Sequence, residues 1–134
     1  MKKITPIFVV EQIEPCLSFW VDRLGFDKTV EVPHGASLGF VILAKGNVEI
    51  MYQSRASAFE DAPAVLEGRA NSASPNAIYI EVSDICDIEK RLAGWEIILP
   101  KRTTFYGMTE IGVREPAGNL VMFAQPVPAE SAAS

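Results

Sequence analysis

Hydrophobic and polar positions near the start of the chain predict a strand followed by an amphipathic helix. Apolar residues dominate residues 4–10. After them, apolar side chains recur at the i, i+3, i+4, i+7 spacing of a helix, at Leu17, Trp20, Val21 and Leu24. Pro15 suits the first helical turn, and Gly25 suits a helix end. Because only one face of this helix is apolar, we expect it to pack on a sheet.

Strand patterns follow the predicted helix. Residues 40–43 are apolar, residues 48–52 are mainly apolar, and Gly46 and Asn47 lie between the two stretches. A Gly-Asn pair suits a tight hairpin turn because both residue types tolerate positive φ. The pattern therefore predicts a β-hairpin.

The same order of predicted strands and helix occurs twice along the chain. The segment GNVEIMYQ at 46–53 resembles GNLVMFAQ at 118–125, and the same offset of 72 links Val10 to Val82 and Ile13 to Ile85. The second copy has these predicted elements: a strand at 77–82, Asp84 as the N-cap of a helix with Ile85, Ile88 and Leu92 on one face and Gly94 at its end, and strands at 95–99, 111–114 and 120–124. The repetition indicates a duplicated unit.

Length and composition fit one compact domain over residues 1–134. The chain is 49% hydrophobic and 22% charged, which predicts a folded protein with its own core. We expect module 1 at about 4–53, a linker at 54–75, module 2 at about 76–125 and a loose tail at 126–134. Within the linker, we expect a short helix near 58–68 that covers part of the molecule.

Charge and cysteine content narrow the partners and the compartment. A formal net charge of −5 disfavours binding to nucleic acid. Pro6 and Glu11 interrupt the first apolar stretch well short of a membrane span or signal segment. We therefore expect a cytoplasmic protein without a membrane partner, in which Cys16 and Cys86 are reduced thiols inside helices.

Two motifs resemble the vicinal oxygen chelate superfamily, which includes glyoxalase I, extradiol dioxygenases, fosfomycin-resistance enzymes and bleomycin-resistance proteins. They are FWVDRLGF at 19–26 and EIGVREPAGNLVMF at 110–123, and the resemblance extends over about 4–125. It is strongest to the bleomycin-resistance branch, whose members bind a drug without transforming it. The resemblance implies an α+β fold of tandem βαβββ modules that form curved mixed sheets with helices on the convex side. It also implies a homodimer.

Enzymes of this superfamily hold a divalent cation through the first and last strands of each module. At the matching positions this chain has Thr5, Glu49, Ala77 and Met122. Only Glu49 is a good ligand for a hard or borderline dication, because alanine has no donor atom and a thioether is a poor one. We therefore expect neither the usual metal ion nor another cofactor.

Strand alternation predicts the lining of a small-molecule site. Period two places apolar and aromatic side chains, with a few isolated polar ones, on the same face as Glu49. The resemblance adds Tyr106, followed by Gly107, where the branch presents a ring for stacking. The predicted ligand-binding residues are Thr5, Ile7, His34, Glu49, Met51, Ala77, Tyr79, Glu81, Tyr106 and Met122.

Several of these residues also have a purely structural interpretation. Methionines such as Met51 and Met122 more often fill gaps in the core. His34 fits a solvent-exposed loop, and Glu49 and Glu81 fit an ordinary surface.

Three function classes remain open. The preferred one is a metal-independent binding protein that sequesters an antibiotic or another aromatic compound, with carboxylates that favour positive charge or several N–H donors. The alternative is a lyase or isomerase like lactoylglutathione lyase, or a dioxygenase, with an altered ligand set of Glu49 and either His34 or Glu81. The third is a metal-independent enzyme with Glu49 as general base, which requires desolvation to raise the pKa of Glu49.

Overall fold

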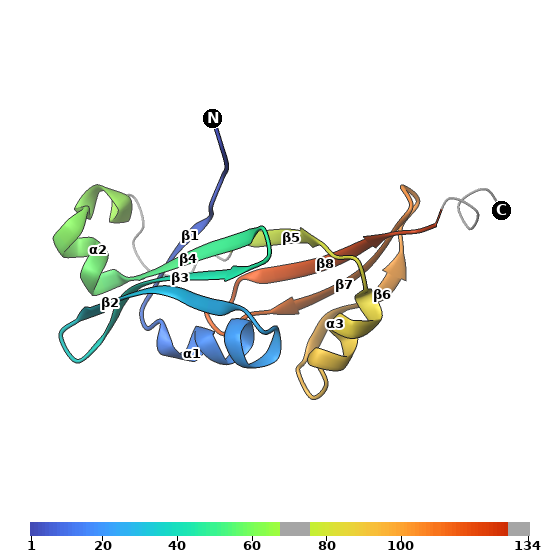
Figure 1. Ribbon diagram of the computed structural model, residues 1–134, viewed down its shortest axis with the longest axis horizontal. Helices are drawn as coiled ribbons and strands as arrows, with labels where there is room; N and C mark the ends of the chain where they lie inside the picture. Colours follow the sequence, from blue (N-terminus) through green and yellow to red (C-terminus); the bar gives the residue numbers. More distant parts are fainter. Residues whose placement is uncertain (68–75, 129–134) are drawn as a thin grey trace. The chain divides into compact units, whose positions relative to one another are not determined.

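The computed structural model describes residues 1–67 and 76–128. The chain divides into two compact units, Met1–Ser74 and Pro75–Ser134. Each unit contains a four-stranded sheet with a helical segment along one face (Figure 1). We call them unit 1 and unit 2.

In unit 1 the strand order is β1-β4-β3-β2, with β1 parallel to β4 and the other neighbours antiparallel. The strands are β1 (Ile7–Val10), β2 (Asp27–His34), β3 (Ser37–Lys45) and β4 (Val48–Ser54). The β3–β4 hairpin turns at Gly46 and Asn47 as predicted, with a φ of 59° at Gly46. Only glycines have positive φ among the described residues, so Asn47 does not need the left-handed conformation here.

The helix predicted at the start of unit 1 is confirmed, but its second half is wound more loosely than an α-helix. It consists of α1 (Glu14–Leu17) and the π-helix η1 (Ser18–Arg23). The Leu24 amide donates to the Phe19 carbonyl five residues back, at 3.1 Å. Phe19 is buried together with Trp20 in this wider turn, whereas the 3.6-residue period places Trp20 but not Phe19 on the predicted apolar face.

The core of unit 1 lies between this segment and the sheet. The Trp20 indole Nε1 donates to Tyr52 Oη at 2.8 Å, and both side chains are fully buried. Tyr52 also contacts Phe8 of β1, with ring centroids 5.5 Å apart. Because successive residues of a strand point to opposite faces, the residues directly before and after Tyr52 in β4 face away from the helix.

The sequence between the modules forms helices, although earlier than expected. They are α2 (Arg55–Asp61) and the 3-10 helix η2 (Pro63–Leu66), whereas the prediction was 58–68. Ser54 caps α2 by accepting from the Ser57 amide at 3.1 Å. The remainder of the predicted linker, 68–75, lies outside the described residues.

Unit 2 repeats the arrangement with strand order β5-β8-β7-β6. Its elements are β5 (Ala77–Glu81), α3 (Ile85–Arg91), β6 (Ile97–Thr103), β7 (Met108–Arg114) and β8 (Leu120–Pro126). Asp84 is the N-cap of α3, as predicted, and its side chain accepts from the Asp87 amide at 3.2 Å. Beyond β8, the Val127 amide donates to the Gly107 carbonyl, so the first part of the predicted tail is bonded to the β6–β7 hairpin.

The predicted α+β fold of two repeated modules is confirmed, but the repeat is not in constant register. Ile7 pairs with Met51 in unit 1, and Tyr79 pairs with Met122 in unit 2. Ile7 and Tyr79 are 72 positions apart, whereas Met51 and Met122 are 71 apart. Met122 is therefore the counterpart of Met51, and the counterpart of Glu49 is Leu120.

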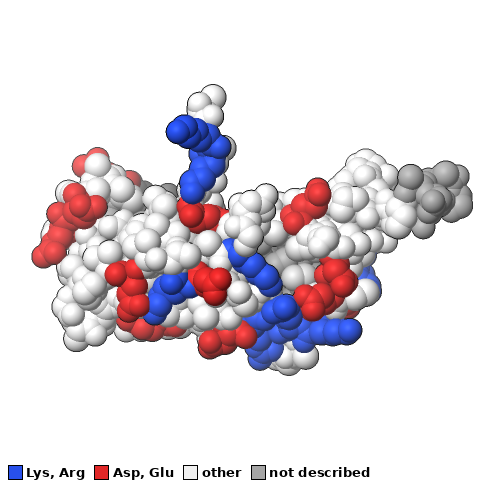
Figure 2. All heavy atoms as spheres, in the orientation of Figure 1, with Lys and Arg blue, Asp and Glu red and all other residues white. Residues whose placement is uncertain are grey.

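Acidic and basic side chains are interspersed over most of the face seen in Figure 2, and several basic ones are adjacent to one another at its lower right. Both cysteines lie in helices and neither is part of a disulfide, as expected, with Cys16 buried and Cys86 exposed. Within residues 1–67 and 76–128, no helix is long and apolar enough to cross a membrane.

Candidate functional site

One face of the unit 1 sheet presents a carboxylate among apolar side chains. Along β4, Ile50 and Tyr52 are buried against the helical segment, whereas Glu49, Met51 and Gln53 are partly exposed. Pairing places Ile7 beside Met51 on this face. The predicted alternation is therefore confirmed, and we call this surface the Glu49 face.

Glu49 is already engaged by two groups from the N-terminal segment. Its Oε1 accepts from Lys3 Nζ at 2.9 Å and from Thr5 Oγ1 at 3.1 Å. These hydrogen bonds, the one from Lys3 first, hold the pKa of Glu49 below its ordinary value of 4.5. A general base needs the opposite shift, so the environment of Glu49 does not meet the requirement of the third function class, a metal-independent enzyme.

His34 lies far from Glu49 within unit 1. His34 ends β2 and pairs with Ser37 of β3, whereas Glu49 pairs with Ala44 at the other end of β3. Seven residues of strand separate the two positions by about 23 Å. His34 Nε2 lies instead 2.8 Å from Glu60 Oε2 of α2, so the altered ligand pair of Glu49 and His34 is wrong.

The residues at the superfamily's metal-ligand positions do not fit a hard dication. Thr5 donates its hydroxyl to Glu49, Ala77 offers no donor atom, and the counterpart of Glu49 in unit 2 is Leu120. Met122, two pairing rows further along β8, offers only a thioether. In the part of the chain that the structure describes, no three His, Cys, Asp or Glu side chains converge as a metal site would require.

Unit 2 contains a more elaborate arrangement around a buried carboxylate, which we call the Glu110 cluster: Glu110, Tyr79, Tyr106 and Arg102. Glu110 Oε2 accepts from Tyr79 Oη at 2.6 Å and from Tyr106 Oη at 2.9 Å. Oε1 accepts from Arg102 Nε at 3.3 Å and Nη2 at 3.2 Å. Only 1% of Glu110 is exposed, so all four hydrogen bonds form around a carboxylate shielded from water.

Local structure explains how these four side chains meet. Arg102 of β6 and Glu110 of β7 are cross-strand partners, and Ala124 of β8 pairs with Glu110 on its other side. Tyr106 lies in the short loop between β6 and β7, followed by Gly107 at a φ of 80°. Tyr79 comes from the far edge strand β5 and reaches Glu110 across β8, where Ala124 is small and fully buried.

The hydrogen bonds define the charge state of the cluster. Donation by Tyr79, followed by Tyr106 and Arg102, lowers the pKa of Glu110 against the opposing effect of desolvation, so the carboxylate is ionised at neutral pH. The same bond to Glu110 is the main reason why the pKa of Tyr79 is raised to about 12. Tyr79 therefore remains a neutral donor over the physiological range.

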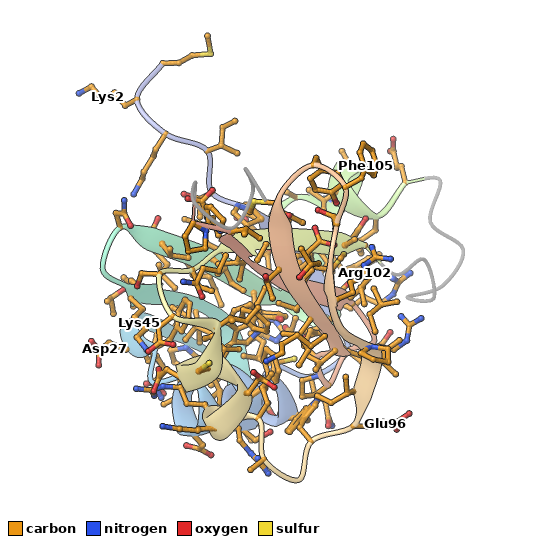
Figure 3. The ribbon with its side chains drawn as sticks, turned by 90° about the vertical axis from the view of Figure 1, so that its right-hand side faces the viewer. Lys2, Asp27, Lys45, Glu96, Arg102 and Phe105 are labelled. Carbon is orange, nitrogen blue, oxygen red and sulfur yellow. The ribbon has the colours of Figure 1, made fainter. Side chains whose placement is uncertain are left out.

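The aromatic rings of the cluster remain accessible although their hydroxyl groups are fixed. Half of Tyr79 and 55% of Tyr106 are exposed. Phe105 is completely exposed and packs edge-on against Tyr106, with centroids 5.0 Å apart. Arg102 and Phe105 both belong to the β6–β7 hairpin (Figure 3).

The structure brings some of the predicted site residues together within each unit. Thr5 contacts Glu49, Tyr79 is adjacent to Met122, and Tyr79 and Tyr106 share Glu110. Ala77 begins β5 next to Leu120, and Glu81 ends β5 in the same row as Ala124. Glu110 and Arg102 were not predicted. Period two along TEIGVR does place Glu110 and Gly112 on one face, but that pattern gives no sign of the tyrosines that converge there.

No protein-family model and no curated protein sequence matches the chain. Solved structures are similar to it over nearly its whole length. TioX from Micromonospora sp. ML1 is 17% identical, with 93% of this chain and 99% of that chain covered and a TM-score of 0.75. Lactoylglutathione lyase from Agrobacterium tumefaciens is 13% identical, with coverage of 93% and 94% and a TM-score of 0.71. A bleomycin resistance determinant encoded on transposon Tn5 is 17% identical, with coverage of 94% and 98% and a TM-score of 0.67.

These similarities support the resemblance to the vicinal oxygen chelate superfamily at the level of the fold. The chain has the architecture shared by glyoxalase, bleomycin-resistance and dioxygenase proteins. These proteins include a lyase and a resistance determinant, so the fold alone does not decide between catalysis and binding, and the choice depends on the side chains of this chain.

Proposed function

We propose that this protein binds a small organic molecule with an aromatic ring, without using a metal ion at the superfamily's ligand positions. The observation that supports this proposal most strongly is the Glu110 cluster. Two tyrosine rings are half-exposed while their hydroxyl groups are held by one buried carboxylate. Aromatic surface of this kind is what a planar ligand stacks on.

The rings of Tyr79 and Tyr106 are already held in place before a ligand binds, and this favours binding. A flexible side chain loses rotamer freedom when a ligand immobilises it, at a cost of about 0.5–1.5 kcal/mol. Hydrogen bonds of 2.6 Å and 2.9 Å to Glu110 already restrict Tyr79 and Tyr106 in the free protein. Met122, adjacent to Tyr79, adds a polarisable apolar contact.

The Glu49 face contributes less to the proposal. Its carboxylate would attract a cationic or amide-rich ligand, but such a ligand must first displace Lys3. Lys3 is two-thirds exposed and Glu49 one-quarter exposed, so the ion pair is weak enough to be exchanged. The biological role we propose is sequestration of an antibiotic, and the similar fold of a bleomycin resistance determinant supports this role.

A thermal-shift panel tests the proposal. The panel contains glycopeptide antibiotics, glutathione adducts, catechols and divalent metal salts, because any compound that binds only the folded state raises the melting temperature. We expect an aromatic compound to stabilise the protein and to be recovered chemically unchanged. Turnover of a glutathione adduct or catechol, or stabilisation by metals alone, would favour the enzymatic alternative.

Matched variants locate the site. Tyr106→Ala removes one ring of the Glu110 cluster. It should lower the affinity for the stabilising compound about tenfold, a change typical of a lost stacking partner in a binding site. The control is Phe59→Ala, which removes another accessible ring, 70% exposed, from α2 of unit 1. Equal effects of the two substitutions would contradict the proposed location.

A further inference from the structure

The accessible charge of the Glu110 cluster is positive, although the cluster as a whole is neutral. Glu110 is 1% exposed, whereas 56% of the Arg102 side chain is exposed. A ligand that approaches the rings of Tyr79 and Tyr106 therefore meets the guanidinium group and does not meet the carboxylate. Only the guanidinium group is therefore accessible for direct hydrogen bonds to a ligand.

Arg102 retains hydrogen-bonding capacity. A guanidinium group has five N–H donors, and Arg102 uses Nε and Nη2, both toward Glu110 Oε1. Within residues 1–67 and 76–128, no protein acceptor is bonded to Nη1. The Nη1 and Nη2 edge of a guanidinium matches the two oxygens of a carboxylate in a bidentate pair.

We propose that the Glu110 cluster is a subsite for a planar aromatic acid, with the ring against Tyr79 and Tyr106 and the carboxylate on the free edge of Arg102. The proposal rests on the proposed function and specifies the charge of the ligand. Glu110 is a positioning residue in this subsite. It holds both phenol groups and one edge of the guanidinium, and it touches no ligand itself.

Neighbouring charges are compatible with an anionic ligand. Lys101, next to Arg102 in β6, pairs with Glu89 of α3 at 2.9 Å and thus faces the helix side of the sheet. Glu81 lies in the same row as Arg102 and Glu110 but on the opposite edge strand. Three strand spacings, about 14 Å, separate the backbones of Glu81 and Arg102, so Glu81 opposes an anion at Arg102 only weakly.

Three ligands of one shape and different charge test the proposal: naphthoate, naphthamide and naphthylmethylammonium, titrated by calorimetry or by chemical-shift changes. We expect naphthoate to bind about three- to fivefold more tightly than naphthamide, a modest factor because Arg102 is exposed and already paired. The ammonium compound should bind more weakly than the amide. Equal affinities for acid and amide, or a preference for the cation, would overturn the proposal and leave the proposed function intact. Failure of all three to bind would overturn the subsite, and the proposed function would fall with it only if no aromatic compound of the thermal-shift panel binds either.

Substitutions on the two faces of β6 give a matched comparison. Arg102→Gln should abolish the preference for naphthoate while naphthamide still binds, and Arg102→Lys should restore part of it. Lys101→Gln makes the same change of charge on the helix side and should leave the preference unaltered. If Lys101→Gln reduces the preference as much as Arg102→Gln does, general surface charge explains the binding and the subsite is refuted.

Glu110→Gln distinguishes positioning from simple structural support. Loss of the negative charge leaves Arg102 uncompensated, so the ratio of naphthoate to naphthamide affinity should rise. Affinity for naphthamide should fall because both tyrosine rings are held less firmly. A variant that weakens both ligands by the same factor would contradict the positioning role.

Discussion

At the scale of single residues, the environment of a carboxylate matters more than its presence. Glu49 and Glu110 both have a lowered pKa, but different neighbours lower it. Glu49 is partly exposed and paired with a flexible lysine, whereas Glu110 is buried beneath two phenol groups and a guanidinium group. Glu110 therefore holds the side chains of a surface in place, whereas a ligand for Glu49 must compete with Lys3.

Titration of Tyr79 provides a direct test of the Glu110 cluster. The phenol should ionise with a pKa of about 12, compared with an ordinary value of 10.0. Glu110→Gln should move it back toward 10, because the largest cause of the shift is the hydrogen bond to the carboxylate. The phenolate absorbance of the native protein, minus that of Tyr79→Phe, isolates this group from Tyr52 and Tyr106. An unshifted titration in the native protein would contradict the geometry.

The same pair makes stability depend on pH in two windows. Folding raises the pKa of Tyr79, so its contribution to stability is complete below pH 10 and is lost as the pH rises through about 12. Folding lowers the pKa of Glu110, so its contribution is present above about pH 4.5 and is lost as the pH falls through the lower folded value. In Glu110→Gln, the free energy of unfolding should therefore decrease less steeply as the pH falls.

At the scale of elements, pairing geometry imposes requirements that local patterns do not reveal. The β2–β3 ladder is irregular between Val32 and Pro33, and Gly39 lies opposite this irregularity. A Cβ atom at Gly39 would lie 2.7 Å from the Cβ of His34 and 3.2 Å from that of Ser57. Glycine at position 39 thus permits β2, β3 and the start of α2 to approach closely.

Gly39→Ala should therefore destabilise the fold by about 1–3 kcal/mol, the usual cost of forcing extra volume into a packed region. Chemical denaturation of the two proteins measures the difference. Ser37→Ala, at an exposed position of the same hairpin, should change stability by less than about 0.5 kcal/mol. A Gly39→Ala protein as stable as the native one would show that β2 and α2 are further apart than described.

At the scale of the whole molecule, each unit has a small core of its own. Unit 1 spans 74 residues and unit 2 spans 60, and domains of this size are only marginally stable alone. The sequence-based prediction of a single domain therefore implies that both units unfold in one cooperative transition. The predicted homodimer belongs to the same scale, and sedimentation equilibrium would test it.

Tyr52→Phe tests this cooperativity. The substitution leaves the buried Trp20 indole without the acceptor that now lies 2.8 Å away, which should cost about 1–3 kcal/mol. In a single domain, the slowest-exchanging amides of β7 and β8 in unit 2 should lose protection by the same free energy as those of β3 and β4. Unchanged protection in unit 2 would show that the units unfold separately.

Local spacing in the sequence was sufficient to predict most elements and faces. The helix of unit 1, the N-cap at Asp84, the hairpin turn at Gly46 and the exposed alternation of Glu49 with Met51 were all confirmed. These features depend on residues within about one turn or one strand of each other, so the periods of 3.6 and 2 encode them directly. The π-helical turn was not predicted because the 3.6-residue period assumes regular α-helix.

Only the tertiary structure decided which side chains meet. Glu110 lies 31 residues from Tyr79, and the hydrogen bond between them depends on the order β5-β8-β7-β6 and on the small residue Ala124 beneath. Strand pairing also moved the counterpart of Glu49 from Met122 to Leu120, two residues earlier in β8. The amino-acid sequence alone determined the repeated fold, because the pattern of apolar residues fixes which face of each element is buried. The chemistry of the candidate site was decided by contacts across strands, which depend on pairing and side-chain reach and leave no periodic trace along the chain.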